Sequence, residues 1–238
     1  KNVIREFESV IHATDTFRYI IPTSEPPAEW CHTGFQDTAW LSGQGGFGHG
    51  EGIYNTTVSD TLMSVFIRKP FTIEDISTIV NAQLHVDYDD AFVAFLNGTE
   101  IARSNIRPDG AVPHYNQPAW RQHESNLLNG GLPELFTVNH DELMRNLVEG
   151  DNVLGLQLHN NWLDDEMSIN SWFSLGLNSN ASQFSETPDW SFHDTLMLHT
   201  GYKLDSQGES VLLFDSEGNL LSSLIFPEIP ADHSYGRY

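Results

Sequence analysis

Apolar and polar residues alternate along most of this chain, which is the pattern of β-strands that turn one face toward a core. The clearest runs lie at residues 84–88, 92–96, 154–158 and 169–177. Successive side chains of a strand point to opposite faces, so each run presents one apolar row. His85 and Asp87 are expected on the face opposite the core, and the predicted inward residues are Leu84, Val86, Tyr88, Phe92, Ala94, Leu96, Leu154, Leu156, Leu158, Ile169, Phe173, Leu175 and Leu177.

Two local signals interrupt the strands. Asn97-Gly98 follows one run and supplies the positive φ angles of a tight hairpin turn. One short helix is predicted after Asn139, a good N-cap with Glu142 three residues later, and Gly150 is expected to stop it. Antiparallel strands with a single short helix predict an all-β fold, an antiparallel β-sandwich of the jelly-roll kind.

Two segments lack this periodicity and are predicted to be long loops. Residues 41–56 are rich in glycine, and residues 104–133 are polar and punctuated by prolines. Loops of such length usually carry function or are mobile.

A change of composition predicts a domain boundary. Residues 178–190 are rich in Asn, Ser, Glu and Pro, as a linker is, and strands are predicted beyond it at 209–214 and 220–226. Two strands cannot form a core alone, so this tail either docks on the first domain or begins a second one. The predicted division is a β-sandwich at residues 1–178, a linker at 179–193 and the start of a second domain at 194–238.

The net charge of the chain argues against some classes of binding partner. The chain has 33 acidic residues against 11 Lys and Arg, a formal net charge of −22. Such a field repels nucleic acid and anionic membrane surfaces, and it suits cations and neutral ligands such as glycans. No stretch approaches the roughly 20 apolar residues of a membrane span, so no membrane insertion is expected. Cys31 is the single cysteine, which excludes an intrachain disulfide, and a start at Lys1 is expected of a processed or trimmed protein.

Four segments occur in a recognisable order: WCHTGFQDTAW at 30–40, GGFGHGEG at 45–52, YDDAFVAFLNGTEIAR at 88–103 and LVEGDNVLGLQLHN at 147–160. Across residues 15–177 the chain resembles the galactose-binding-like, sugar-binding jelly-roll modules attached to glycoside hydrolases in bacterial exported proteins. Ala91 stands where that pattern has Gly. The resemblance implies a sandwich fold, a carbohydrate ligand and a secreted or cell-surface location in a bacterium.

The tail from His199, HTGYKLDSQGESVLLFDSEGNLLSSLIFPEIPADHSYGRY, resembles the opening of a bacterial lamin-tail domain, an immunoglobulin-like module. The resemblance implies other domains in the same polypeptide. It implies binding or architecture, and no activity, for this piece.

Two clusters of carboxylates are candidate metal ligands. Ca²⁺ prefers six to eight oxygen ligands, and sandwich modules often hold one such ion as a structural cofactor. The alternative is that an acidic chain places such runs on solvated turns by chance. The candidate ligands are Asp87, Asp89, Asp90, Asp164, Asp165 and Glu166.

Aromatic residues in loops are the candidate sugar contacts, because the C–H face of a sugar ring packs on an aromatic ring while polar groups fix its orientation. Trp30 and Trp40 belong to the framework and are expected in the core. A site in the loops is favoured over the sheet face, where Trp172 alternates away from the core and is either exposed or covered by the tail. The candidate ligand-binding residues are Tyr115, Trp120, Arg121, His123, Asn160, Asn161, Trp162 and Trp172.

The sequence holds no convincing catalytic motif. Residues 43–48 match a dinucleotide fingerprint formally but lack the strand–turn–helix context, and no His-Glu-x-x-His or Gly-x-Ser-x-Gly motif is present. With so many acidic residues, no glycosidase pair stands out. We therefore expect a non-catalytic carbohydrate-binding module; the alternatives are a structural spacer or adhesion module and, less supported, a glycan-active enzyme.

Overall fold

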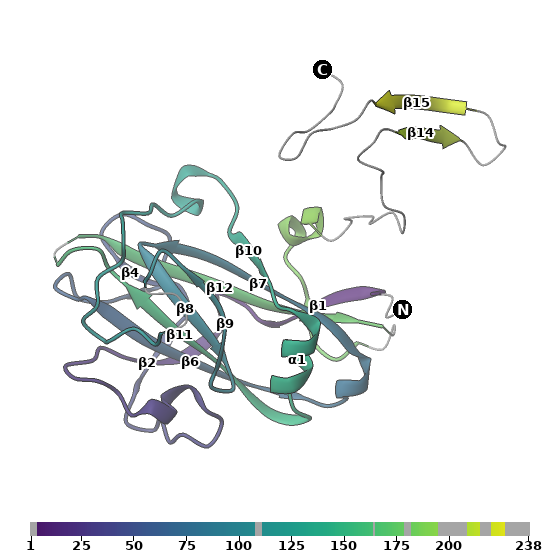
Figure 1. Cartoon of the computed structure of the whole chain (residues 1–238). Helices are drawn as coiled ribbons and strands as arrows, with labels where there is room; N and C mark the ends of the chain where they lie inside the picture. The colour runs from purple at the N-terminus through teal and green to yellow at the C-terminus, as the bar shows by residue number, and fades with distance from the viewer. Residues whose placement is uncertain are drawn as a thin grey trace. The chain divides into compact units, whose positions relative to one another are not determined.

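The computed structural model describes residues 4–107, 111–163, 165–178, 182–194, 209–214 and 220–226. The chain divides into two compact units, Lys1–Phe192 and His193–Tyr238. The first unit consists of two sheets packed face to face, as Figure 1 shows, which confirms the predicted all-β sandwich. Within the described residues, no helix is long and apolar enough to cross a membrane.

The strands of the first unit form a seven-stranded and a six-stranded sheet, and every described pairing is antiparallel except that of β4 with β5. The seven-stranded sheet has the order β10 (Glu134–Thr137), β7 (Ile79–Asp89), β12 (Met167–Leu177), β1 (Glu6–Ile11) and β13 (Ser185–Glu186), with β4 (Phe47–His49) on β12 and β5 (Thr56–Thr57) on β4. The six-stranded sheet has the order β3 (Leu41–Gln44), β2 (Thr16–Ile20), β6 (Ser64–Ile73), β11 (Gly150–His159), β8 (Ala91–Leu96) and β9 (Thr99–Ser104).

The main core fills the space between the sheets. All thirteen side chains that the alternation predicts to point inward belong to this cluster, which confirms the strand assignments. A second apolar cluster lies on the other side of the six-stranded sheet, where Phe66, Val93 and Phe95 alternate with main-core residues. Trp30 and Trp40 cover it and are buried, as predicted. β8 is therefore apolar on both faces, because loops seal the outer one.

The structure confirms the predicted hairpin turn and the predicted start of the helix, and it corrects the predicted end of the helix. Asn97 and Gly98 have φ angles of 52° and 93° in the turn between β8 and β9. Asn139 caps α1 (His140–Asn146), where its side chain accepts hydrogen bonds from two backbone N–H groups. The prediction that Gly150 stops this helix is wrong. The helix ends at Asn146, and Gly150, with φ 93°, begins β11.

The prediction of one long loop at residues 41–56 is wrong, because the segment contains β3 and β4. Its glycines allow close packing of backbones. A Cβ at Gly45 would clash with the carbonyl oxygen of Ala13, and one at Gly48 with that of Met167. The segment leads from strand to strand, so the dinucleotide match has no structural basis.

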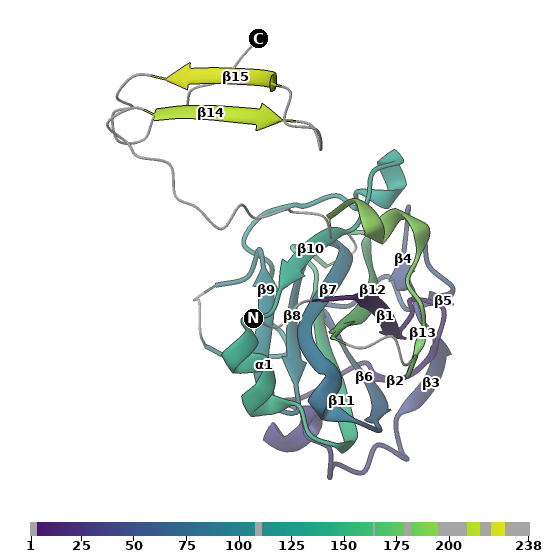
Figure 2. The same cartoon turned by 90° about the vertical axis from the view of Figure 1, so that its right-hand side faces the viewer.

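Part of the predicted linker belongs to the sandwich. β13 pairs with β1, as Figure 2 shows, and Glu8 accepts hydrogen bonds from the backbone N–H groups of Gln183 and Phe184 at 2.8 and 2.7 Å. A short 3₁₀ helix, η4 (Asp189–Asp194), follows, and its Trp190 packs on Trp172. The first unit therefore extends beyond residue 178. Residues 179–181 lie outside the described part of the chain.

The second unit contains one described hairpin. Its strands β14 (Glu209–Phe214) and β15 (Leu220–Phe226) pair antiparallel and confirm both predicted strands. The predicted turn at residues 216–219 lies outside the described residues.

Candidate functional site

One buried carboxylate ties together the loops at the end of the sandwich where β7 runs into β8. Asp90 accepts hydrogen bonds from the backbone N–H groups of His123 at 2.8 Å and Asn161 at 2.7 Å. Its own carbonyl oxygen accepts a hydrogen bond from the Asn105 side chain at 3.0 Å. Burial raises the pKa of Asp90, while the two N–H groups act to lower it. A single aspartate thus joins its own turn to two connections, β9–β10 and β11–β12, that are far apart in sequence.

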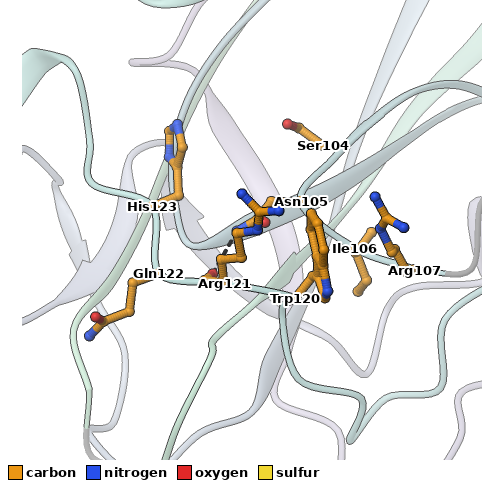
Figure 3. A pocket seen from close by; sticks show the side chains of 8 residues that line it. All are labelled: Ser104, Asn105, Ile106, Arg107, Trp120, Arg121, Gln122 and His123. Atoms are coloured by element: carbon orange, nitrogen blue, oxygen red, sulfur yellow. Dashed lines mark hydrogen bonds between the residues drawn. The ribbon is translucent and has the colours of Figure 1, made fainter.

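A surface hollow of about 410 Å³ opens beside this junction. The Asn105 side chain also donates to the carbonyl of Arg121 at 2.6 Å, which fixes one side of the hollow against the other. The backbone of Trp120 donates to the carbonyl of Asn105 at 2.8 Å. Figure 3 shows the lining residues, which are Ser104, Asn105, Ile106, Arg107, Trp120, Arg121, Gln122 and His123.

Trp120 stands between two arginines. The guanidinium carbon of Arg121 lies 3.6 Å from the Trp120 ring centroid and that of Arg107 lies 3.8 Å from it. Figure 3 shows them on opposite sides of the indole. Cations are attracted to an aromatic face by its quadrupole. Both faces of Trp120 are therefore occupied, and the interpretation of this ring as a stacking platform for sugar needs revision; its edges account for its 48 % exposure.

Trp162 is the most exposed tryptophan among the described residues, at 66 %. With the Asn161 amide oriented to suit its neighbours, its oxygen accepts from the Trp162 indole N–H at 3.3 Å and from the backbone N–H of Gln122 at 3.1 Å. Gln122 lines the hollow, so one side chain links the exposed indole to the hollow's wall. The structure thus brings Trp162, Asn161 and Trp120 into one loop cluster.

His123 forms part of the wall and has little hydrogen-bonding capacity left for a ligand. Its ring stacks on Tyr88 with centroids 4.2 Å apart, and its nitrogens face the Tyr88 carbonyl at 3.0 Å and a Glu134 carboxylate oxygen at 3.1 Å. Both partners are acceptors, so both nitrogens donate only when the imidazole is protonated. Burial raises the pKa of Tyr88 to about 12, and its hydroxyl donates to Ser104 at 2.7 Å.

Three other candidate residues lie elsewhere or are enclosed. Tyr115 packs against the second apolar cluster and does not line the hollow. Asn160 is fully buried, where its side chain donates to the Asp165 carbonyl and shapes the loop. Trp172 faces away from the main core, as the alternation predicts, and is covered by Trp190 with ring centroids 5.1 Å apart.

The described acidic candidates serve the loops as hydrogen-bond acceptors. Asp87 accepts from the Ser125 hydroxyl at 2.6 Å and from the backbone of Leu127 at 3.0 Å. Asp165 accepts from the Gln122 side chain at 3.1 Å, and Glu166 accepts from the backbone of Glu51 at 2.6 Å. Asp164 lies outside the described residues. These carboxylates therefore hold the loops through hydrogen bonds.

Asp89 differs from these neighbours. Only 4 % of it is exposed, and burial raises its pKa to about 8, with further increases from Asp90, Glu124, Glu166 and Asp165. Across the described part of the chain, no three His, Cys, Asp or Glu side chains are arranged to hold a metal ion. The geometry there gives calcium no support, and a calcium site stays a prediction.

Several residues that line the hollow were not predicted from the sequence. They are Ser104, Asn105, Ile106, Arg107 and Gln122. Arg107 carried a usable signal, because it is one of only 11 basic residues and lies in a long loop. The role of Asn105 depends on a positive φ of 56° and on distant carbonyls, which no local pattern reveals.

The single cysteine is unsuited to nucleophilic chemistry. Cys31 is buried beneath a second hollow of about 320 Å³, and burial raises the pKa of its thiol to about 11. A neutral thiol is a poor nucleophile.

No protein-family model and no curated protein matches this sequence. Similar solved structures include a β-glucuronidase of glycoside hydrolase family 2, at 9 % identity and a TM-score of 0.41 over 71 % of this chain and 18 % of that one. They also include a β-glucuronidase of an uncultured Clostridium sp., at 10 % identity and a TM-score of 0.39 over 74 % of this chain and 30 % of that one. A third is the β-glucuronidase of Bacteroides uniformis, at 11 % identity and a TM-score of 0.42 over 93 % of this chain and 26 % of that one. This chain spans between 18 % and 30 % of those proteins, so what it binds must be inferred from its own loop end.

Proposed function

We propose that this chain is a non-catalytic carbohydrate-binding module of a larger secreted or surface bacterial protein, and that its glycan lies across the loop end. The observation that carries the proposal is the exposed indole of Trp162, which Asn161 links to the wall of the hollow. Tryptophan is usually mostly buried, and a ring held open beside polar groups is typical of a sugar platform. No other ring of the described residues stacks on it.

The polar lining of the hollow meets the other requirement of a sugar site, which is hydrogen bonding to the sugar hydroxyls. Sugar hydroxyls need groups that donate and accept hydrogen bonds within reach of the stacked ring. Gln122 and Arg121 lie on the same wall of the hollow and are exposed. They give the loop end hydrogen-bonding groups next to an apolar platform, which a simple spacer does not require.

The lining also favours binding over catalysis. Glycoside hydrolysis usually requires two carboxyl groups on either side of the scissile bond. None of the eight residues that line the hollow carries a carboxylate. Asp89, whose raised pKa would suit an acid catalyst, is buried and is not among them.

A glycan array followed by calorimetry with the best ligand tests the proposal. Trp162→Ala should weaken binding by about 1–3 kcal/mol if the ring is a central anchor, and Trp162→Phe should retain part of the affinity. Leu41→Ala, which removes an exposed apolar side chain from β3, is the matched control and should bind normally. If no glycan binds the parent, or if Trp162→Ala binds normally, the spacer or adhesion alternative replaces this function.

Calcium is a separate proposal with its own measurement. An ion that binds only the folded state raises the melting temperature by mass action. Adding millimolar Ca²⁺ to chelated protein should therefore raise it if the acidic loops hold calcium. An unchanged melting temperature rejects the ion and leaves the carbohydrate proposal intact.

A further inference from the structure

Within the described residues, two cations of the hollow form no ion pair in a strongly acidic protein. The chain has only 11 Lys and Arg against 33 acidic residues, and three of the six other basic side chains that the structure describes lie in ion pairs. Arg68 lies 3.0 Å from Asp37, and Lys69 lies 3.4 Å from Asp15. Arg107 and Arg121 form no ion pair with any residue that the structure describes. Both guanidinium groups are exposed and lie on opposite faces of Trp120, so a ligand with negative charge can reach each of them.

The stacking arrangement leaves the hydrogen-bonding edges of both arginines available. A guanidinium group that lies on an aromatic ring contacts it with its flat face, while its N–H groups point outward in its own plane. Neither Arg107 nor Arg121 donates a side-chain hydrogen bond to a described residue, and both guanidinium groups contact the Trp120 ring. Trp120 therefore acts as a spacer that holds two donor edges apart at the mouth of the hollow.

The surroundings reinforce the preference for an anion. The lining itself contains no carboxylate. The net charge of −22 repels polyanions at long range, but screening limits that field to about 8 Å at physiological ionic strength.

We propose that Arg107 and Arg121 bind the carboxylate or sulfate substituents of an acidic saccharide, each through its outward N–H edge on its own side of the Trp120 ring. This proposal rests on the proposed carbohydrate-binding function and names its ligand class. Trp162 supplies the apolar platform for the sugar ring, and the arginines select the charged substituent. Carboxylate and sulfate share the bidentate geometry that arginine recognises.

Two matched pairs of oligosaccharides test the proposal by calorimetry. The first pair is oligogalacturonate and its methyl ester, and the second is a sulfated galactan oligosaccharide and its desulfated form. At least one acidic member should bind on the order of tenfold more tightly than its neutral partner, which corresponds to one charge-assisted hydrogen bond. The pair that shows the difference identifies carboxylate or sulfate as the recognised group.

Arginine variants then assign the effect to the hollow. Arg107→Gln and Arg121→Gln should each remove most of the preference for the acidic member and leave affinity for the neutral member nearly unchanged. Arg121→Lys keeps the charge without the planar fork and should retain an intermediate preference. Arg145→Gln, which removes an exposed cation from α1, is the control for net charge and should behave as the parent. Melting temperatures establish that each variant is folded.

The outcomes separate this proposal from the one on which it rests. If the parent binds neutral and acidic members equally and the arginine variants change nothing, the charge preference is rejected while carbohydrate binding stands. If the arginine variants lose both members equally, the arginines support the fold of the loop and do not select charge. If no member of either pair binds and the glycan array is also negative, both proposals are rejected.

Discussion

Two tryptophan sites at different parts of the sandwich have opposite environments. Trp172 lies on the outer face of the seven-stranded sheet, and Trp190 from η4 packs edge-on against it at 85°. The same Trp190 also packs against His85 at 5.1 Å. Trp162, in the loop between β11 and β12, is 66 % exposed and has its indole N–H directed to Asn161.

The difference shows that a strand's alternation determines which way a side chain points and not whether solvent reaches it. Trp172 and His85 point away from the main core, as the pattern requires, but a later segment of the chain covers them. The sheet face is therefore closed as a binding surface by residues that the composition assigned to a linker. Trp162 has no such cover among the described residues and remains available to a ligand.

The largest expected effect is on the free energy of unfolding, and it should distinguish a buried framework tryptophan from the exposed one. Trp40→Ala removes a side chain that is only 7 % exposed and stacks beside Trp30 at 6.2 Å, so it should lower the free energy of unfolding by about 3–5 kcal/mol. Trp162→Ala should change it by less than about 0.5 kcal/mol. Urea denaturation measures both. Similar losses of unfolding free energy in the two variants would mean that Trp162 is packed against the protein and is not open to a ligand.

Next in size is the effect of the carboxylate that organises the loop end. Asp90→Ala removes the acceptor of two backbone hydrogen bonds and should lower the free energy of unfolding by about 3 kcal/mol and abolish glycan binding. Asp87→Ala is the matched control, because Asp87 also accepts two hydrogen bonds but anchors residues that do not line the hollow. It should reduce stability similarly and retain binding. Loss of binding in both variants would contradict a localised site.

Removing the cover of the sheet face should have an intermediate effect. Trp190→Ala exposes Trp172 and His85 and should lower the free energy of unfolding by about 2 kcal/mol through lost aromatic contact. Glycan affinity should be unchanged, since the proposed site is in the loops. Calorimetry and urea denaturation check the two parts. Altered affinity in this variant would transfer the site to the sheet face.

The smallest expected effect is a pH-dependent stabilisation of the fold when Asp89 is replaced. The folded-state pKa of Asp89 is raised to about 8, whereas an unfolded chain has an ordinary value of about 3.9. Between these values the folded protein binds more protons than the unfolded chain, so this group's contribution to stability decreases as pH rises through that window.

Asp89→Asn removes this titration. The gain in unfolding free energy relative to the parent should be larger at pH 9 than at pH 5 by at least about 1.4 kcal/mol, the equivalent of one pKa unit. Urea denaturation at the two pH values measures it. An equal change at both would indicate that Asp89 titrates normally. Asp151→Asn, at an exposed position of β11, is the matched control for an Asp-to-Asn substitution in this fold.

Local patterns predicted the framework well, because they depend on short-range physics. Alternation identified the inward face of β7, β8, β11 and β12, and Asn97-Gly98 identified the turn of the β8–β9 hairpin. Asn139 identified the start of α1. The glycines at 43–48 misled the prediction, because glycine marks close backbone approach as readily as a loop, and only the neighbouring chain distinguishes them.

By itself, the sequence determined an antiparallel sandwich, the inward face of its main strands and an acidic surface, since these follow from side-chain period and composition. It also indicated that aromatic residues in the loops are the candidate contacts. Only the tertiary structure decided which aromatic rings are open. Trp190 covers Trp172, and Arg107 and Arg121 occupy the faces of Trp120, while Asp90 joins its own turn to two distant connections beside one hollow. Most of these contacts join residues far apart in the chain, and no local pattern encodes which distant side chain will fill a given space.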